Sequence, residues 1–226
     1  MDYSERNKKV AQARWKKVIE KEKRNIPTDN KSLLLKSLLC GLLAGDGSVQ
    51  IRNEKKSIHY QLDFFPDDKY MLDKYCEIIQ KLYNKKPQIK NKQNFFSVRL
   101  GSKTIIEDLN EISNFGLKEW TLPEELWKIE GAKENWLSGF FSAEAYVGPN
   151  CIKLQTINEK GMNKISELLN ELEIEHCSYQ YTPKNLKHSK VYIIFINKKE
   201  ARKNYFNRIG FVHNKKYKKL KETLNL

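Results

Sequence analysis

Two acidic side chains stand at the ends of apolar segments, 98 residues apart. Asp46 closes the segment 33–46, and Glu144 closes the segment 136–144. A carboxylate at the C-terminal end of a helix lies at the negative end of the helix dipole, where it is disfavoured without a compensating partner. Two adjacent carboxylates also repel each other unless a proton or a cation lies between them. The pattern therefore indicates a pair of acids that bind a cation.

Small residues repeat in step with these acids. Gly41 and Gly139 each precede the acid by five residues, and Gly45 lies on the same helical face as Gly41. A face of small residues lets another backbone approach closely, so we expect the two helices to pack together and bring their acids side by side. The sequence also permits a simpler interpretation, in which two core helices end in incidental acids. Gly47 is a natural residue to end the first helix. The predicted contact between the helices consists of Gly41, Gly45, Gly139 and Ala143.

The segment Gly-Leu-Leu-Ala-Gly-Asp-Gly at 41–47 resembles the LAGLIDADG motif of homing endonucleases. Gly-Phe-Phe-Ser-Ala-Glu-Ala at 139–145 resembles a second, diverged copy of that motif, and the resemblance covers about residues 31–210. It implies an α+β fold in which two pseudo-twofold related αββαββα half-domains form a saddle, with the motif helices packed at its centre. The two-motif, single-chain type of this family is expected to act as a monomer.

Composition sets the outer bounds of function. The chain has 226 residues, a net charge of +14 and a pI near 9.4, which favours a polyanionic partner, although a Lys-rich solvated surface would give the same balance. The first apolar run contains Lys36 and is too short to cross a membrane. The four cysteines have no CxxC spacing and are typical of reduced thiols in an intracellular protein. We therefore expect an intracellular protein, in the cytoplasm or nucleoid or in a eukaryotic organelle.

Hydrophobic periodicity divides the chain into four parts. Residues 1–30 form a basic N-terminal extension, in which residues 1–24 carry nine Lys or Arg against four Asp or Glu. The pattern of this extension is compatible with either an amphipathic helix or a frayed tail. The remaining parts are a first half-domain at 31–125, a second at 126–210 and a basic C-terminal tail at 211–226. We expect the extension and the tail to add nonspecific nucleic-acid contacts.

The two half-domains are predicted to contain the same elements in the same order. In the first, strands at 48–52 and 58–64 follow the motif helix, then a helix to about residue 84, strands near 87–92 and 94–101, and a helix from 103 to about 113. In the second, strands at 145–148 and 151–157 precede a helix at 159–173, strands at 177–182 and 190–197, and a helix at 198–209.

The resemblance also implies a chemistry. Two carboxylates that hold divalent ions can polarise a phosphodiester and activate water, and hard oxygen ligands select Mg²⁺ or Mn²⁺. Asp46 and Glu144 are the expected ligands, with Gly45 and Ala143 beside them. The family keeps a lysine at the start of the helix after the fourth strand, and Lys103 and Lys198 stand at that place in the two halves. Either could equally be a surface lysine.

Polar residues alternate along the predicted strands, and the resemblance implies that these faces lie in the major groove of double-stranded DNA at a long, nearly asymmetric target. The expected DNA-contacting residues are Ser48, Gln50, Arg52, His59, Gln61, Lys90, Lys92, Arg99, Lys153, Gln155 and Lys190. An intron-encoded, free-standing protein is the expected origin.

Three departures from the family pattern bear on cleavage. The family places a polar residue near the end of the second strand, whereas this chain has Phe64-Phe65 in the first half and Thr156-Ile157 in the second. Ala145 also replaces the glycine that closes the motif. The sequence therefore keeps two alternatives open beside a nuclease: an RNA-binding intron maturase and a DNA-binding regulator that does not cut.

Overall fold

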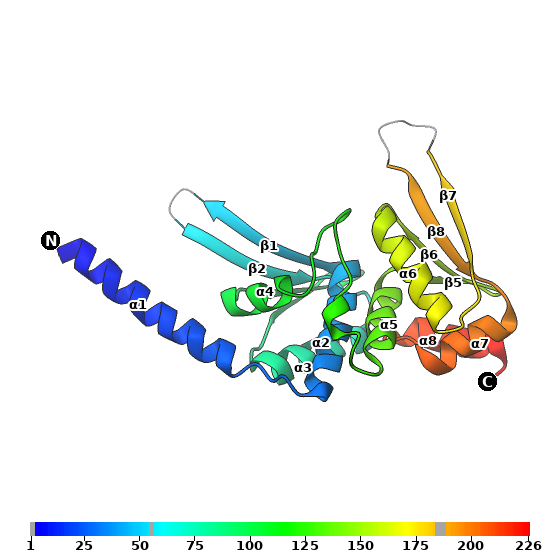
Figure 1. Cartoon of the computed structure of the whole chain (residues 1–226), viewed down its shortest axis with the longest axis horizontal. Coiled ribbons are helices and arrows are strands. Elements are labelled where there is room, and N and C mark those ends of the chain that lie inside the picture. The colour runs from blue at the N-terminus through cyan, green and yellow to red at the C-terminus, as the bar shows by residue number, and fades with distance from the viewer. Residues whose placement is uncertain (1–2, 55–56, 184–188) are drawn as a thin grey trace.

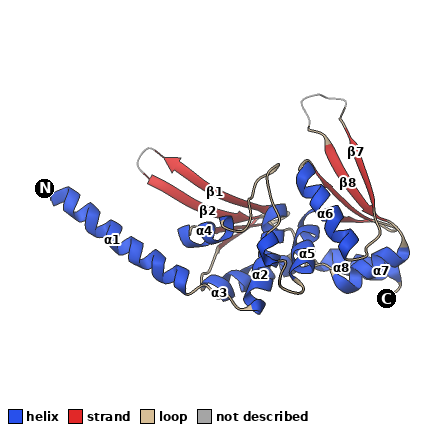
Figure 2. Ribbon diagram, viewed as in Figure 1, coloured by secondary structure: helices blue, strands red, loops and turns tan. Residues whose placement is uncertain are grey.

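The computed structural model describes residues 3–54, 57–183 and 189–226. Its strands form two four-stranded antiparallel sheets with the same order of strands (Figures 1 and 2). The first sheet has the order β1 (Gly47–Glu54), β2 (Ser57–Phe64), β4 (Phe96–Leu100) and β3 (Gln88–Asn91). The second has the order β5 (Tyr146–Val147), β6 (Ile152–Thr156), β8 (Val191–Ile196) and β7 (Cys177–Tyr181). The predicted duplication of the fold is confirmed.

Two central helices join the halves. They are α2 (Asn30–Asp46) and α5 (Ala132–Glu144), and Figure 1 shows the sheets rising on either side of them. Asp29 caps α2, because its side chain accepts a hydrogen bond from the Ser32 N–H at 3.1 Å. Both helices are almost entirely buried along their apolar segments. The predicted packing of the motif helices at the centre is therefore confirmed.

Close backbone contact explains the glycines in these helices. A Cβ on Gly41 would lie 2.2 Å from the carbonyl oxygen of Trp136, and a Cβ on Gly139 would lie 2.6 Å from that of Leu38. A Cβ on Gly45 would lie 2.3 Å from the Cβ of Ala143. The structure thus places all four small residues of the expected interface at the crossing of the two helices. No larger side chain fits there without separating them.

Two helices cover the inner face of each sheet. In the first half they are α3 (Lys69–Tyr83) and α4 (Lys103–Asn110), capped by the side chains of Asp68 and Ser102. In the second half they are α6 (Glu159–Glu171) and α7 (Lys199–Arg208). The apolar face of α3 is buried as a whole, with Met71, Leu72, Tyr75, Ile78, Ile79 and Leu82. One 3-10 turn, η1 (Glu124–Leu126), lies in the connector between the halves.

The ends of the chain are also helical. Of the two forms expected for the N-terminal extension, the structure has the helix, α1 (Tyr3–Arg24). Figure 1 shows that α1 extends away from the body on the side of the β1–β2 hairpin. Residues expected to form a basic tail instead form α8 (Asn214–Leu224), which buries Leu220 and Leu224. These two leucines, four residues apart, give the segment an apolar stripe that its many lysines hide in the sequence. No helix in the described ranges is long and apolar enough to cross a membrane.

Gly47 differs from its prediction. It has φ −102° and ψ 165°, an extended conformation that any residue can adopt, so it does not act as a left-handed helix cap. It begins β1 directly, because the helix passes into the strand without a turn. The glycine is needed for space instead: a Cβ there would lie 2.5 Å from the Cα and the carbonyl oxygen of Leu43.

Candidate active site

The two motif acids meet where α2 and α5 end. A Cβ on Gly45 would lie 3.2 Å from the Cγ of Glu144, so the backbone beside Asp46 touches the side chain of the other acid. Burial, followed by the negative charge of Glu144, raises the pKa of Asp46 to about 7. Loss of solvent around its carboxyl group also raises the pKa of Glu144. The structure thus brings together two carboxylates that disfavour each other's charge, as the sequence pattern requires.

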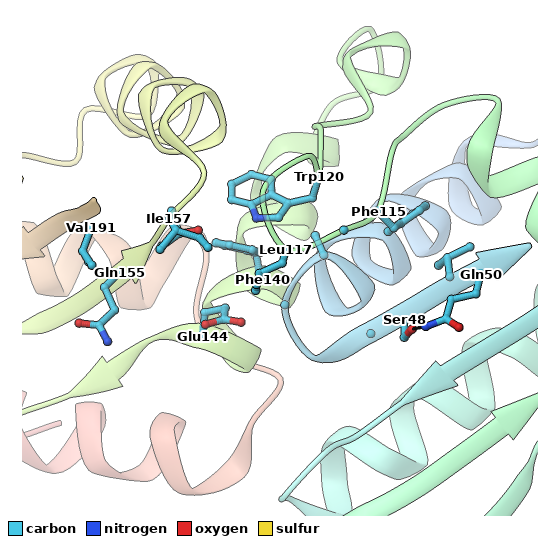
Figure 3. A pocket seen from close by; sticks show the side chains of 16 residues that line it. Ser48, Gln50, Phe115, Leu117, Trp120, Phe140, Glu144, Gln155, Ile157 and Val191 are labelled. Carbon is cyan, nitrogen blue, oxygen red and sulfur yellow. Dashed lines mark hydrogen bonds between the residues drawn. The ribbon is translucent and has the colours of Figure 1, made fainter. Parts of the chain in front are cut away.

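A cavity of about 600 Å³ opens beside these helix ends. Figure 3 shows Glu144 in it, between Ser48 and Gln50 on one side and Gln155 on the other. The connector between the halves closes part of the cavity with Phe115, Leu117 and Trp120. The cavity therefore joins one motif acid to polar side chains from both sheets.

The expected DNA-contacting residues of the first half share one face of their sheet. Residues opposite each other in an antiparallel pair lie on the same face. The register pairs Gln50 with Gln61, Arg52 with His59, and Asp63 with both Ser48 and Arg99. Lys90 pairs with Ser97 on that face, and Lys92 follows β3 in the turn. The polar alternation in the sequence therefore corresponds to one open surface.

A hydrogen-bonded network orders this surface. Arg52 donates to the side-chain oxygen of Gln50 at 2.7 Å, and Gln50 donates to Ser48 at 2.7 Å. Arg99 makes two bonds to Asp63, at 2.7 and 3.3 Å, and Gln61 donates to the same carboxylate. Asp63 is only 3% exposed, so its partners hold a buried charge in place.

The second sheet carries fewer of the expected contacts. Lys153 and Gln155 lie on its open face, where the register pairs them with Phe195 and Ile193. Lys190 precedes β8, and its ammonium group lies 5.3 Å from the ring centre of Tyr192. Tyr192 pairs with Thr156 and therefore points to the opposite face from Gln155. Lys190 is thus not brought to the surface that holds the other two.

Neither predicted lysine reaches the acids. Lys103 lies 5.7 Å from the ring centre of Tyr60 and 3.5 Å from Glu107. Tyr60 stands four residues along β2 from Phe64, which is roughly 13 Å at the usual rise of a strand. Lys198 is the N-cap residue of α7 and forms an ion pair with Glu175. The antiparallel strands carry both lysines away from the end of the sheet where the acids lie.

A different lysine, Lys216, lies at the end of α5. The Nζ of Lys216, on α8, donates to the carbonyl oxygens of Ser142 and Ala143 at 2.7 and 2.8 Å. Its charge lowers the pKa of both Asp46 and Glu144, against the effect of burial. The sequence shows only a lysine-rich run at 215–221, and nothing in its spacing singles out this residue. Only the packing of α8 reveals it.

The residues fit a divalent cation in part. Two carboxylates with helix-end carbonyls are the hard oxygen ligands that such ions prefer. The carbonyl of Ala143, an expected ligand, already accepts a hydrogen bond from Lys216. Within the described ranges, no cluster of three or more His, Cys, Asp or Glu side chains is placed to hold a metal ion.

The departures noted in the sequence lie close to the acids. The Phe65 N–H donates to the carbonyl oxygen of Asp46 at 3.0 Å, so the end of β2 adjoins the first acid. Phe64 is buried and stacks on Tyr75, with ring centres 4.5 Å apart. Thr156 and Ile157 line the cavity. An apolar pair therefore adjoins the first acid, at the place where the resemblance led us to expect a polar residue.

Comparison with known proteins finds one family model that matches part of the chain. Residues 132–210 match the model of the LAGLIDADG-like domain. The second half of this chain is therefore similar to a LAGLIDADG-like domain. The resemblance predicted from the two motifs is confirmed, and Lys216 lies beyond the matched residues.

Solved structures with the LAGLIDADG fold resemble the whole arrangement. The homing endonuclease I-DmoI, in complex with DNA and Mn, has a TM-score of 0.64 and 17% identity over 79% of this chain and 97% of its own. The homing endonuclease I-WcaI, bound to its DNA recognition sequence, has a TM-score of 0.56 and 16% identity over 92% of each chain. At these identities the likeness establishes the fold.

One curated relative is similar in sequence. It is the uncharacterized protein MJ0398 of Methanocaldococcus jannaschii, which is 24% identical over 205 residues, 83% of this chain and 70% of its own. DUF199/WhiA from Thermatoga maritima also shares the fold, with a TM-score of 0.51 and 12% identity over 92% of this chain and 64% of its own. The fold is therefore not confined to proteins that are named as homing endonucleases.

Proposed function

We propose that this protein is a site-specific double-strand DNA endonuclease of the homing type. The observation that carries the proposal is the pair Asp46 and Glu144, which meet at the ends of the two motif helices beside a cavity lined from both sheets. A structural role does not require two carboxylates there, since each raises the cost of ionising the other. Structural neighbours that are homing endonucleases bound to DNA support the same conclusion.

The chain's own residues have distinct roles in this proposal. Asp46 and Glu144 would hold Mg²⁺ or Mn²⁺, which polarises the phosphodiester and activates water when it is bound. The open faces of the two sheets would position the DNA across the helix ends, with Gln50 and Gln155 nearest the cut. The net charge of +14 would supply sequence-independent attraction to phosphates.

The expected form of the target follows from the duplication. A single chain with two unlike halves presents two unlike surfaces, so we propose a monomer that reads a long, nearly asymmetric site. The boundaries 31–125 and 126–210 are proposed as the duplicated units. An intron-encoded origin remains part of this proposal.

The direct test is cleavage of target DNA selected by binding from a randomised library. We expect double-strand cleavage with Mg²⁺ or Mn²⁺ and none with a chelator. Asp46→Asn and Glu144→Gln should each lower the cleavage rate at least about a hundredfold, because the loss of one charge removes a metal ligand. DNA affinity should survive or increase, since a repulsion with phosphate is lost.

Asp73→Asn provides a matched control, because Asp73 is an exposed acid on α3 that forms an ion pair with Lys69. It should leave cleavage unchanged. Full double-strand cleavage by both motif variants would refute the assignment of Asp46 and Glu144.

Binding without cleavage is the second candidate. The observation that favours it is the bond between Lys216 and the Ala143 carbonyl, which occupies an expected metal ligand. A protein that binds its selected target tightly but leaves it intact with Mg²⁺ and Mn²⁺ would establish this alternative.

A further inference from the structure

Helix α8 is fixed against both halves of the molecule. The Ser142 hydroxyl of α5 accepts hydrogen bonds from the backbone N–H groups of Val212 at 2.7 Å and His213 at 3.3 Å. On the other side, His213 Nε2 lies 3.0 Å from Asp67 of the first half. The first turn of α8 is therefore positioned by contacts to both motif-containing units.

This attachment places one ammonium group at the end of α5. Lys216 is partly buried, and its two bonds to the Ser142 and Ala143 carbonyls use oxygens that the helix leaves without partners. Burial lowers the pKa of Lys216, while the negative charges of Asp46, Asp67 and Glu144 act in the opposite direction. Its own charge favours the ionised form of both Asp46 and Glu144, as the charge of a bound metal ion would.

In the described part of the first half, no lysine or arginine is bonded at the corresponding helix end. Within the described ranges, no side-chain donor forms a hydrogen bond to the carbonyl of Gly45, which corresponds to Ala143 in the duplicated fold. The backbone of Phe65 is bonded one residue further on, at Asp46. The two helix ends therefore differ: one carbonyl is open to a ligand and the other is occupied by the chain itself.

We propose that Lys216 is a resident cation of the second motif, which limits the pair of acids to one divalent ion held from the side of Asp46 and Gly45. This inference rests on the proposed function, because it assumes that the acids bind metal. The inference predicts that each protein molecule binds one divalent ion. Two equivalent helix ends would instead bind two.

The experiment counts Mn²⁺ bound to the full-length protein, free and with selected target DNA, by electron paramagnetic resonance at saturating ion. We expect one Mn²⁺ for the wild type and two for Lys216→Met, which keeps most of the length of the side chain and removes its charge. Lys218→Met is the matched control, because Lys218 is exposed on the same helix, and it should bind one. Mn²⁺ should also raise the melting temperature of Lys216→Met more than that of the wild type.

Two ions bound to the wild type, or one bound to a folded Lys216→Met protein, would overturn the inference. If Lys216→Met does not fold, Lys216→Ala, which removes both the charge and the donor to the two carbonyls, should bind two. A wild type that binds no Mn²⁺ refutes both this inference and the metal-dependent mechanism. A changed ion count without DNA cleavage by any variant supports the role of Lys216 and refutes the proposed activity alone.

Discussion

The open faces of the two sheets differ although their strands follow the same order. The first face carries Gln50, Arg52 and Arg99 in a network of side-chain hydrogen bonds. The second face carries rings: Tyr146, Tyr179 and Tyr181 are each more than half exposed. Lys153 lies 5.9 Å from the ring centre of Phe195 on that face. Duplication has preserved the topology of the two halves, while the chemistry of their surfaces has diverged.

This difference implies two ways of contacting nucleic acid. Amide and guanidinium groups held in fixed positions can read base edges in the major groove. Exposed tyrosines have no such donor pattern, but their rings stack on bases that have left the helix and on sugar surfaces. We therefore expect the first half to contribute most of the base discrimination. A preference for RNA with unpaired bases would favour the maturase alternative over the endonuclease.

The common interface should be the most sensitive part of the molecule. Gly41→Leu would force a side chain into the backbone of α5, where a Cβ alone meets an oxygen at 2.2 Å. We expect a loss of ~3 kcal/mol or more in unfolding free energy, enough to unfold many domains. Gly139→Leu should have a comparable effect, because the contact is reciprocal. Thermal denaturation followed by circular dichroism measures both.

Gly101→Ala serves as the control for these substitutions, since a Cβ there would lie 3.5 Å from the nearest atom, the Tyr60 carbonyl oxygen. It should change stability by less than about 0.5 kcal/mol. A Gly41→Leu protein as stable as this control would show that the helices do not meet at that point.

The contrast between the two faces can be tested with one variant from each. Arg52→Ala removes an exposed guanidinium from the first sheet and should relax base preference at one position by ~1–3 kcal/mol. Tyr179→Ala removes a ring that is 59% exposed on the second sheet, and it should lower the affinity for all DNA sequences by a similar factor. Competition binding with single-base variants of the selected target separates these outcomes. Equal loss of base preference in both proteins would show that the two faces read DNA alike.

Much of the fold could be predicted because the signals are local. The motif glycines and the period-two strands each depend on residues close together in the chain. The pairing of Asp46 with Glu144 was accessible because the motif repeats. Each of these features is visible in a short window of sequence.

The lysines at the site could not be predicted in this way. Lys103 and Lys198 stand at the expected helix starts, but strand direction carries them away from the acids. Lys216 reaches the site through contacts that span more than 70 residues, from α8 to Ser142. Its neighbours in sequence are also lysines, so composition hides the one that is partly buried. Long-range packing decides which member of a basic run meets an acid.

The attachment of α8 to both halves should become less stable at low pH, because His213 is part of it. Burial, with a further contribution from Lys216, lowers its pKa, while Asp67 and Asp68 act in the opposite direction. Below pH 6.5 the unfolded chain therefore binds the proton more readily than the folded protein does, and stability falls as the pH falls. His213→Asn retains a residue that caps α8 well and does not titrate.

We expect the difference in melting temperature between wild type and His213→Asn to shrink, or to reverse, from pH 8 to pH 5. The wild type should lose the larger amount, by roughly a few degrees. Parallel pH profiles of the two proteins would mean that this histidine does not link the halves in a titratable way.

The smallest expected effect concerns α1, which extends the first half alone. Its C-terminal end is anchored, because Lys85 and Thr104 donate to Glu22 at 2.5 and 2.7 Å. Closer to the N-terminus of α1, a cavity of about 460 Å³ is lined by Trp15 on α1 and by Ile58 and His59 on β2. Helix α1 therefore runs beside the hairpin that carries the polar face. Arg14, Lys16 and Lys17 are exposed on this arm. We expect them to contact phosphates at the outer end of the site.

Replacing these three residues by Gln should reduce the slope of log affinity against log salt by up to ~0.9 per lost contact. It should lower the affinity for all DNA sequences equally. The same change at Lys215, Lys218 and Lys221, which are exposed on α8, tests whether the second half has an equivalent arm. We expect a smaller change in slope there, because α8 is packed against the body beside the motif helices and does not extend from it. Equal slopes for the two triple variants would remove this difference between the halves. A change in base preference in the α1 variant would mean that the arm reads the groove itself, since contacts to phosphates are the same for every sequence.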